Sequence, residues 1–449
     1  MKIQPITVLA GAALCLAACR LAAQDDFLER ARDLNRRFVL VDTHVDIPLD
    51  YVAEGGADPT SVDDSLQVDL YKMAAGGVNC VFLVVYTPQG PRTEEDLRKA
   101  RSGITDVRLE AIHRLCRLYP GKFELATSPE DVVRIAREGR KAVAIGMENG
   151  YPIGTDISLL RHYFQEGVRY ITLSHNGHND ICDSANPPNR PTPGGKDLIG
   201  PEMRVMDELY EMEALKEPAP EPEHGGLSGF GREVVAEMNR LGMLIDLSHV
   251  APATVSDVLA SSRAPVIASH SSCRALCDNR RNLTDEQLRS IAAFGGVVQI
   301  TAVSSFVSRQ PERQAALEAA LSESGAAEKG YDGMLALYES DRLAFETISA
   351  RFNELAEEID KKYPLPDVSA FCDHIDHAVQ VMGIDHVGIG SDFGGGGGVK
   401  GFNNAAEAVN VTAELLRRGY LERDIEKIWG KNLLRLWKEV ERVAERLGQ

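Results

Sequence analysis

The stretch VDTHVD, from Val41 to Asp46, carries the residue types of half a metal site at the end of an apolar run. Phe38 to Val41 predicts a short strand, and His44 and Asp46 lie two residues apart just beyond it. Side chains two apart in extended chain point the same way, so this imidazole and this carboxylate converge on one spot. A single His-x-Asp pair is weak evidence, because it also occurs by chance in ordinary loops.

The same pattern, an apolar and β-branched run that ends in His, Asp or Glu, recurs five times further along the chain. The runs and their final polar residues are 141–147 before Glu148, 170–174 before His175, 243–248 before His249, 265–269 before His270 and 386–391 before Asp392. In a (β/α)8 barrel the carboxyl ends of all strands open onto one face, which carries the chemistry. The repeated pattern therefore predicts seven ligand-type side chains at one barrel mouth.

Helical patterns alternate with these runs and complete the prediction of an α/β fold. Segments 78–86 and 297–303 predict two further buried strands, and 93–119 predicts a long amphipathic helix. Counted along the chain, the strand and helix units number eight, which predicts a (β/α)8 TIM barrel.

Two long segments interrupt the alternation. Segment 176–222 is rich in Pro, Gly, Asn and Asp, so we expect loops over the active face, with one helix near 203–215. Segment 306–363 is charged, helical in pattern and nearly free of strand signal. We interpret it as a helical insertion before the last strand and not as a separate domain.

The N-terminal segment 1–23 has the pattern of an export signal, with Lys2 before the apolar run 6–16. Two alternatives stay open for its processing. The sequence Leu-Ala-Ala-Cys that ends at Cys19 matches a bacterial lipobox, which predicts a lipid anchor, whereas cleavage a few residues later predicts a soluble protein. In both cases we expect export to the bacterial cell envelope, with residues 24–449 forming a single barrel domain.

The charge balance excludes several kinds of partner. The 449 residues include 49 Lys and Arg against 67 Asp and Glu, a formal net charge of −18. Such a chain is repelled by nucleic acid phosphates and anionic lipids, so we expect no nucleic acid partner and membrane contact only through a lipid anchor. The six cysteines beyond the signal include no CxxC pair, and their disulfide pairing stays open.

Imidazoles and carboxylates without thiolates suit zinc or a similar divalent ion. The candidate ligands are His44, Asp46, Glu148, His249 and His270. Three histidines and two carboxylates exceed what one four-coordinate catalytic zinc needs. We therefore predict two zinc ions bridged by Glu148, one completed by the VDTHVD pair and the other by His249 and His270. Two metals roughly 3.5–4 Å apart can share a hydroxide and stabilise a hydrolytic transition state.

The segments VDTHVD, GMEN, ITLSH, IDLSH, ASHSSCRALCDNRRN and DHVGIGSDF occur in this order along nearly the whole mature chain. Together they resemble the membrane dipeptidase (renal dipeptidase, peptidase M19) family, a branch of the amidohydrolase-like, metal-dependent (β/α)8 hydrolases. The resemblance implies a zinc dipeptidase that cleaves dipeptides with a free C-terminal carboxylate, tolerates a D-residue on that side and uses a bridging hydroxide at a dinuclear site. It also implies the same five metal ligands and a homodimer.

The resemblance assigns further roles that spacing does not supply. His175 would contact the scissile carbonyl oxygen and stabilise the developing oxyanion. Arg281, with Arg280 as a competitor for the role, would hold the substrate carboxylate through two hydrogen bonds. Asp392 would orient the bridging hydroxide and pass a proton to the leaving amine. With Glu148, His175 and Asp392 are the expected catalytic residues.

One loop departs from the family pattern. Family members commonly read Asp-Phe-Asp-Gly after the eighth strand, whereas this chain reads Asp392-Phe393-Gly394 and continues with Gly395 to Gly398. We expect five glycines to make this loop mobile, and the missing acid to change substrate preference.

Two other functions stay open. The changed loop also fits a hydrolase of another small amide, such as an N-acyl amino acid or a β-lactam. An inactive envelope binding protein is the third hypothesis, but it predicts a broken ligand set, and the set here is complete. His374 and His377, three apart on a predicted helix, are interpreted as a solvated surface and not as a metal pair.

Overall fold

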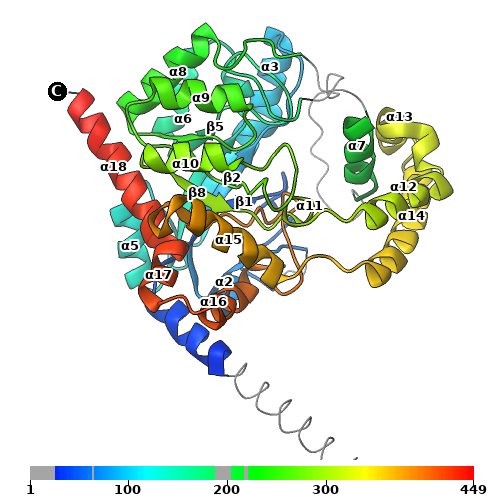
Figure 1. Cartoon of the computed structure of the whole chain (residues 1–449). Coiled ribbons are helices and arrows are strands. Elements are labelled where there is room, and N and C mark those ends of the chain that lie inside the picture. The colour runs from blue at the N-terminus through cyan, green and yellow to red at the C-terminus, as the bar shows by residue number, and fades with distance from the viewer. Residues whose placement is uncertain (1–25, 63–64, 188–203, 217–220, 449) are drawn as a thin grey trace, which may run out of the picture.

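Eight parallel strands follow one another around a barrel in their order along the sequence, and helices surround them (Figure 1). The computed structural model describes residues 26–62, 65–187, 204–216 and 221–448. The predicted export signal at 1–23, with its lipobox at Cys19, lies outside these residues. Within them, no helix combines the length and the apolar character that crossing a bilayer requires. The predicted (β/α)8 barrel is confirmed.

The barrel strands are β1 (Leu40–Asp46), β2 (Val78–Tyr86), β4 (Lys141–Glu148), β5 (Val168–Thr172), β6 (Leu244–Asp246), β7 (Ile267–Ala268), β8 (Val297–Ile300) and β9 (Val387–Ile389). The strands β5 to β9 all end earlier than the sequence predicts, so the polar residues after β5, β6, β7 and β9 lie in the loops just beyond. A short strand that the sequence did not predict, β3 (Phe123–Leu125), pairs with β4 outside the ring. Three residues are too few for a periodic pattern.

The ring closes between β9 and β1 through residues that follow β9. The backbone N–H of Asp46 donates to the carbonyl of Phe393 at 2.8 Å, and the N–H of Asp392 donates to the carbonyl of His44 at 3.1 Å. These bonds extend the parallel sheet beyond the last strand. Barrel closure therefore places Asp392 next to the predicted metal ligands of β1.

Alternation along β4 explains why Glu148 points into the barrel. Ala142 and Ala144 belong to the buried cluster that includes Tyr170 inside the ring, whereas Val143 and Ile145 belong to the core between the strands and the helices. Successive side chains of a strand point to opposite faces, so Glu148 shares the interior face with the two alanines. Small side chains at these positions leave room inside the ring for larger ones from neighbouring strands.

The surrounding helices are α2 (Leu70–Gly76), α3 (Glu94–Ala100), α4 (Asp106–Leu118), α5 (Pro129–Arg137), α6 (Ile157–Gln165), α8 (Gly229–Leu241), α9 (Pro252–Ser261), α10 (Asp285–Ala293), α15 (Val368–Met382), α16 (Ala408–Arg417), α17 (Glu422–Glu426) and α18 (Asn432–Leu447). Their starts follow local chemistry: Thr284 and Gln287 form a capping box before α10. The single helix predicted at 93–119 is divided by a π-helical turn, Arg101–Thr105.

The predicted insertion forms a separate helical cluster at one side of the barrel (Figure 1). It contains α12 (Pro311–Ser324), α13 (Ala326–Ser340) and α14 (Arg342–Lys362), whereas the short helix α11 (Ser304–Val307) stays at the barrel, where Val307 packs in the main core. The helix α7 (Arg204–Lys216) packs with them: Leu209 shares a buried apolar core with Leu317 and Phe352, and Arg204 pairs with Asp360 at 3.0 Å. The helix that the sequence placed among loops over the active face is therefore part of this cluster.

The prediction of a solvated histidine face on α15 is wrong for His374, which is 1% exposed. The backbone N–H of Cys273 donates to its Nδ1 at 3.0 Å, so its Nε2 donates to the carbonyl of Val307 at 2.9 Å. Its neighbour His377 bonds Asp285 at 2.7 Å. His374 therefore joins α15 to the loop at Cys273, and His377 joins α15 to α10, roles that the helical pattern alone does not reveal.

The barrel interior predicts an effect of added volume on stability. A Cβ atom at Gly146 would lie 2.1 Å from Cζ of the buried Tyr170 ring. Gly146→Ala should therefore displace that ring and destabilise the protein by about 1–3 kcal/mol, measured as a lower urea midpoint.

Gly103→Ala is the matched control, because no atom lies within 4 Å of a Cβ there. It should leave the midpoint unchanged or raise it slightly. An equal midpoint for the two variants would show that the interior has room to spare beside Tyr170.

Candidate metal centre and active site

Four strand ends bring the five predicted ligands to one buried point at the barrel mouth. They are His44 and Asp46 on β1, Glu148 at the end of β4, His249 after β6 and His270 after β7. All five side chains belong to buried residues. The parallel strands run the same way, so ligands far apart in the sequence become neighbours.

Glu148 lies at the centre of this group. Its Oε1 is 2.9 Å from His249 Nε2 and 3.3 Å from His270 Nε2, and its Oε2 is 3.4 Å from His44 Nε2. Each carboxylate oxygen thus faces a different set of imidazoles. This is the arrangement expected of a carboxylate that joins two metal sites.

The donor atoms fit divalent metal ions. The buried Nε2 of His44 has no hydrogen-bond partner among the described residues, although carboxylate oxygens of Asp46 and Glu148 lie 3.5 and 3.4 Å away. The described residues contain three groups of donors close enough to hold an ion. The groups are His44, Glu148 and His270; Glu148, His175 and His249; and His44, Asp46 and Asp392. Imidazole and carboxylate donors without thiolates suit zinc and similar ions.

Three residues at the mouth have left-handed backbone conformations, which non-glycine residues rarely adopt. Asn149, directly after Glu148, has φ of 80°, His249 has φ of 67° and Asp392 has φ of 65°. Such strain costs about 1–3 kcal/mol per residue and persists only where surrounding contacts hold it. The conformation of Asp392 places its Oδ1 3.7 Å from His44 Nε2.

His175, after β5, lies at the rim of the same group. Its ring centre is 4.0 Å from that of His249 and 4.8 Å from that of Tyr86, and its Nε2 is 3.6 Å from Glu148 Oε1. Burial lowers the pKa of His175 to about 4, although Glu148 raises it, so the imidazole is neutral at pH 7. At 16% exposure its side chain is the most accessible of the predicted catalytic groups.

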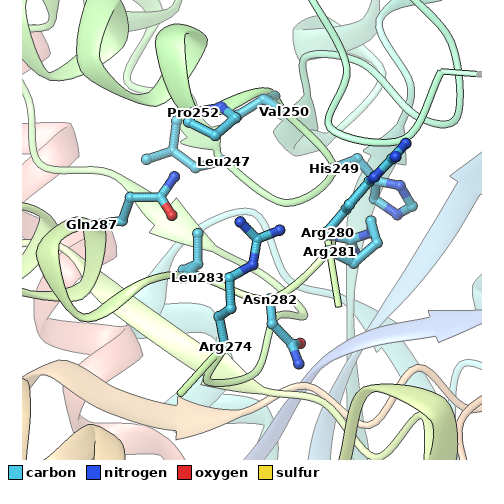
Figure 2. A pocket seen from close by; sticks show the side chains of 10 residues that line it. All are labelled: Leu247, His249, Val250, Pro252, Arg274, Arg280, Arg281, Asn282, Leu283 and Gln287. Carbon is cyan, nitrogen blue, oxygen red and sulfur yellow. The ribbon is translucent and has the colours of Figure 1, made fainter. Parts of the chain in front are cut away.

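Arg281 is buried beside the centre, whereas Arg280 is exposed, which distinguishes the two candidates. The Nη2 of Arg281 donates to the carbonyl of His270 at 3.2 Å, and the Arg281 guanidinium lies 5.4 Å from the centre of the Phe306 ring. Burial lowers its pKa to about 10, against the opposing effect of Asp392, so it stays cationic at neutral pH. Figure 2 shows both arginines with His249 on one side of a small cavity.

The glycine-rich loop is held by hydrogen bonds at several points, which the expectation of a mobile loop did not foresee. Gln67 accepts from the N–H of Gly394 and donates to the carbonyl of Gly397, each at 2.7 Å. A Cβ atom on Gly395 would lie 2.3 Å from Asp46 Oδ2 and 2.6 Å from Asp392 Oδ1. Glycine is required here because the backbone passes directly against the site.

A cavity of about 360 Å³ opens on the other side of Asp46. Its lining comes from three segments: residues 45–48, 50, 51, 56 and 57 in and after β1, residues 65–68 before α2, and Phe393 and Gly394 after β9. No sequence pattern indicated this cavity, because its walls come from the loop after β1 and from the loop after β9. The sequence did not indicate Gln67 either, which has no motif of its own.

The buried Arg108 of α4 was also missed. Its Nε donates to the carbonyl of Ile47 at 2.9 Å, and its Nη1 donates to that of Tyr86 at 2.6 Å. It thereby ties the ends of β1 and β2 together behind Asp46. A lone arginine in an amphipathic helix carries no sequence signal for such a role.

Comparison with known proteins agrees with this geometry. The model of the family described as membrane dipeptidase (peptidase family M19) matches residues 28–202 and 208–449. Dipeptidase tcpJ of Claviceps purpurea is 30% identical over 400 residues, which cover 88% of this chain and 74% of that protein.

Solved structures show the same fold. The probable dipeptidase PvdM from Pseudomonas aeruginosa is 32% identical and superposes with a TM-score of 0.75, covering 93% of this chain and 99% of that one. A metallo peptidase from Rhodobacter sphaeroides, liganded with a phosphinate mimic of the dipeptide L-Ala-D-Ala, is 21% identical with a TM-score of 0.64 and coverage of 90% and 99%. The family match spans nearly the whole chain, and the chain therefore belongs to the membrane dipeptidase family, peptidase family M19.

Proposed function

We propose that this protein is a zinc-dependent dipeptidase with two ions per chain, acting on dipeptides with a free C-terminal carboxylate. The observation that carries the proposal is Glu148, whose two oxygens face His44 on one side and His249 with His270 on the other. Two ions held there would supply Lewis acidity and a water of lowered pKa at neutral pH.

The residues around the centre match the steps of amide hydrolysis. In this proposal the neutral imidazole of His175 donates to the carbonyl oxygen of the substrate as negative charge develops. Asp392, whose Oδ1 lies 3.7 Å from His44 Nε2, accepts a proton from the attacking water and returns it to the leaving amine. Arg281 supplies the cation for the substrate carboxylate.

The choice of first substrate follows from the relatives and from the site. The Rhodobacter sphaeroides protein holds a mimic of L-Ala-D-Ala, and we propose the same tolerance of a D-residue here. The cavity of about 360 Å³ beside Asp46 leaves room for a larger side chain as well.

Removal of the metal should abolish activity reversibly. We expect purified protein to hydrolyse L-Ala-D-Ala, to lose activity after chelation and to regain it with zinc, because the proposed chemistry requires the ions. A panel of dipeptides, N-acyl amino acids and β-lactams, assayed for released amine or opened ring, identifies the substrate class. Two bound zinc ions with hydrolysis only of the other amides would refute the dipeptidase proposal and keep the metal site.

Glu148→Gln should weaken both metal sites, because it removes the shared negative charge. We expect zinc affinity to fall by more than about 100-fold, beyond the effect of changing an outer contact. Zinc content after dialysis, measured by mass spectrometry, checks this. Glu110→Gln, on the exposed surface of α4, is the control and should retain two zinc ions. Two zinc ions and full activity in Glu148→Gln would exclude the bridging role.

Arg281→Met should raise KM about 10- to 100-fold for dipeptides, since a charge-assisted hydrogen bond is worth about 1.5–3 kcal/mol. The increase in KM should be smaller for a dipeptide amide, which has no carboxylate to bind. Arg280→Met, at the exposed neighbour, should leave KM unchanged. Equal losses on the acid and the amide would mean that Arg281 acts on His270 and not on substrate.

A further inference from the structure

A buried carboxylate lies beneath the metal centre and is not one of its ligands. Asp246, at the end of β6, is fully buried and accepts four hydrogen bonds. Its Oδ1 accepts from the backbone N–H groups of Ser269 at 2.7 Å and Ser248 at 3.0 Å. Its Oδ2 accepts from the hydroxyls of Thr172 at 2.5 Å and Ser269 at 2.6 Å.

The direction of the Ser269 hydroxyl follows from this arrangement. Its oxygen lies 2.6 Å from Asp246 Oδ2 and 2.8 Å from His270 Nδ1. An ionised carboxylate has no hydrogen to give, so the single hydroxyl hydrogen of Ser269 must fill the shorter contact. Toward His270 the hydroxyl can then only accept.

His270 must therefore carry a hydrogen on Nδ1 and donate it to the Ser269 oxygen. A neutral imidazole carries one N–H, so Nε2 keeps its lone pair. That Nε2 is the atom that faces Glu148 Oε1 at 3.3 Å, and a lone pair is what a metal ligand needs there. The hydrogen bonds from Asp246 through Ser269 to His270 thus favour the tautomer whose Nε2 can bind a metal.

We propose that Asp246 is a positioning residue, which acts through Ser269 to hold His270 in the tautomer that binds metal. This inference rests on the metal centre of the proposed function. It concerns mainly the site made by His249 and His270. The Nδ1 of His44 faces the Tyr170 hydroxyl at 2.9 Å, and the Ser269 oxygen is farther away, at 3.5 Å.

The proposal makes an unusual prediction for Asp246→Asn, which changes hardly any volume. The two backbone N–H groups at Oδ1 require the amide oxygen there, so the amide nitrogen takes the place of Oδ2. That nitrogen donates to the Ser269 oxygen and turns its hydroxyl hydrogen toward His270 Nδ1. The ring must then carry its hydrogen on Nε2, where it blocks the metal.

The test measures zinc binding by the full chain after the metal has been removed, in competition with a chelator of known affinity. Ser269→Ala should lower the affinity for one of the two zinc ions about tenfold, as loss of an outer contact commonly does. Asp246→Asn should lower the affinity for the same ion further, by about 100-fold. The double variant Asp246→Asn with Ser269→Ala should return to the level of Ser269→Ala, because the amide then has no hydroxyl to turn.

The control is Thr172→Val, which removes the other hydroxyl on Asp246 and leaves the path to His270 intact. It should bind both zinc ions as the unchanged protein does. Circular dichroism of each metal-free variant establishes that it is folded. If Asp246→Asn does not fold, the comparison of Ser269→Ala with Thr172→Val decides alone: weaker zinc in the first only is the expected result.

Two results would overturn the proposal. One is wild-type zinc affinity in a folded Asp246→Asn or in Ser269→Ala. The other is a double variant as weak as Asp246→Asn, since this would mean that the loss does not pass through Ser269. A starting protein that binds no zinc would instead refute the proposed function itself, before any variant is compared.

Discussion

The structure depends on one buried carboxylate, Glu148, placed among imidazoles at the mouth of a closed barrel. A buried charge without a partner is costly, so a carboxylate in this position requires cations or hydrogen-bond donors around it. His249 and His270 follow the paired strands β6 and β7, and His44 comes from β1, which the hydrogen bonds of His44 and Asp46 with the residues after β9 hold in the closed ring. Barrel closure and the balance of charge at the centre are therefore one physical requirement.

Unusual backbone conformations in the loops hold two of the side chains at this centre. His249 and Asp392 hold left-handed conformations that their surroundings support: the carbonyl of Asp392 accepts from the N–H of Gly397 at 2.7 Å, and that of His249 accepts from Ala185 at 2.7 Å. The glycine-rich loop belongs to this support. Its backbone lies so close to Asp46 and Asp392 that a side chain at Gly395 would meet their oxygens, and close approach explains that glycine better than mobility does.

Much of the fold was predictable from local chemistry. Strand ends marked by Glu148 and His175, the caps of the outer helices and the helical insertion all follow from patterns within a few residues. The helix predicted at 203–215 is present as α7, but its packing on α12–α14 could not be inferred from its own segment. His374 was wrongly assigned to a solvated surface, because its bonds to Cys273 and Val307 join residues that are distant in the chain. Tertiary contacts decided both.

The sequence by itself determined the barrel, its strand order and the types of ligand at its mouth, because apolar runs, the helical patterns between them and the polar residues at their ends are local features of the chain. Only the tertiary structure decided which oxygen of Glu148 faces which imidazole, which of two neighbouring arginines is buried, and which way the Ser269 hydroxyl points. These depend on distances between segments far apart in the chain. A hydrogen bond of 2.6 Å between Ser269 and Asp246 exists only after both strands have taken their places in the ring.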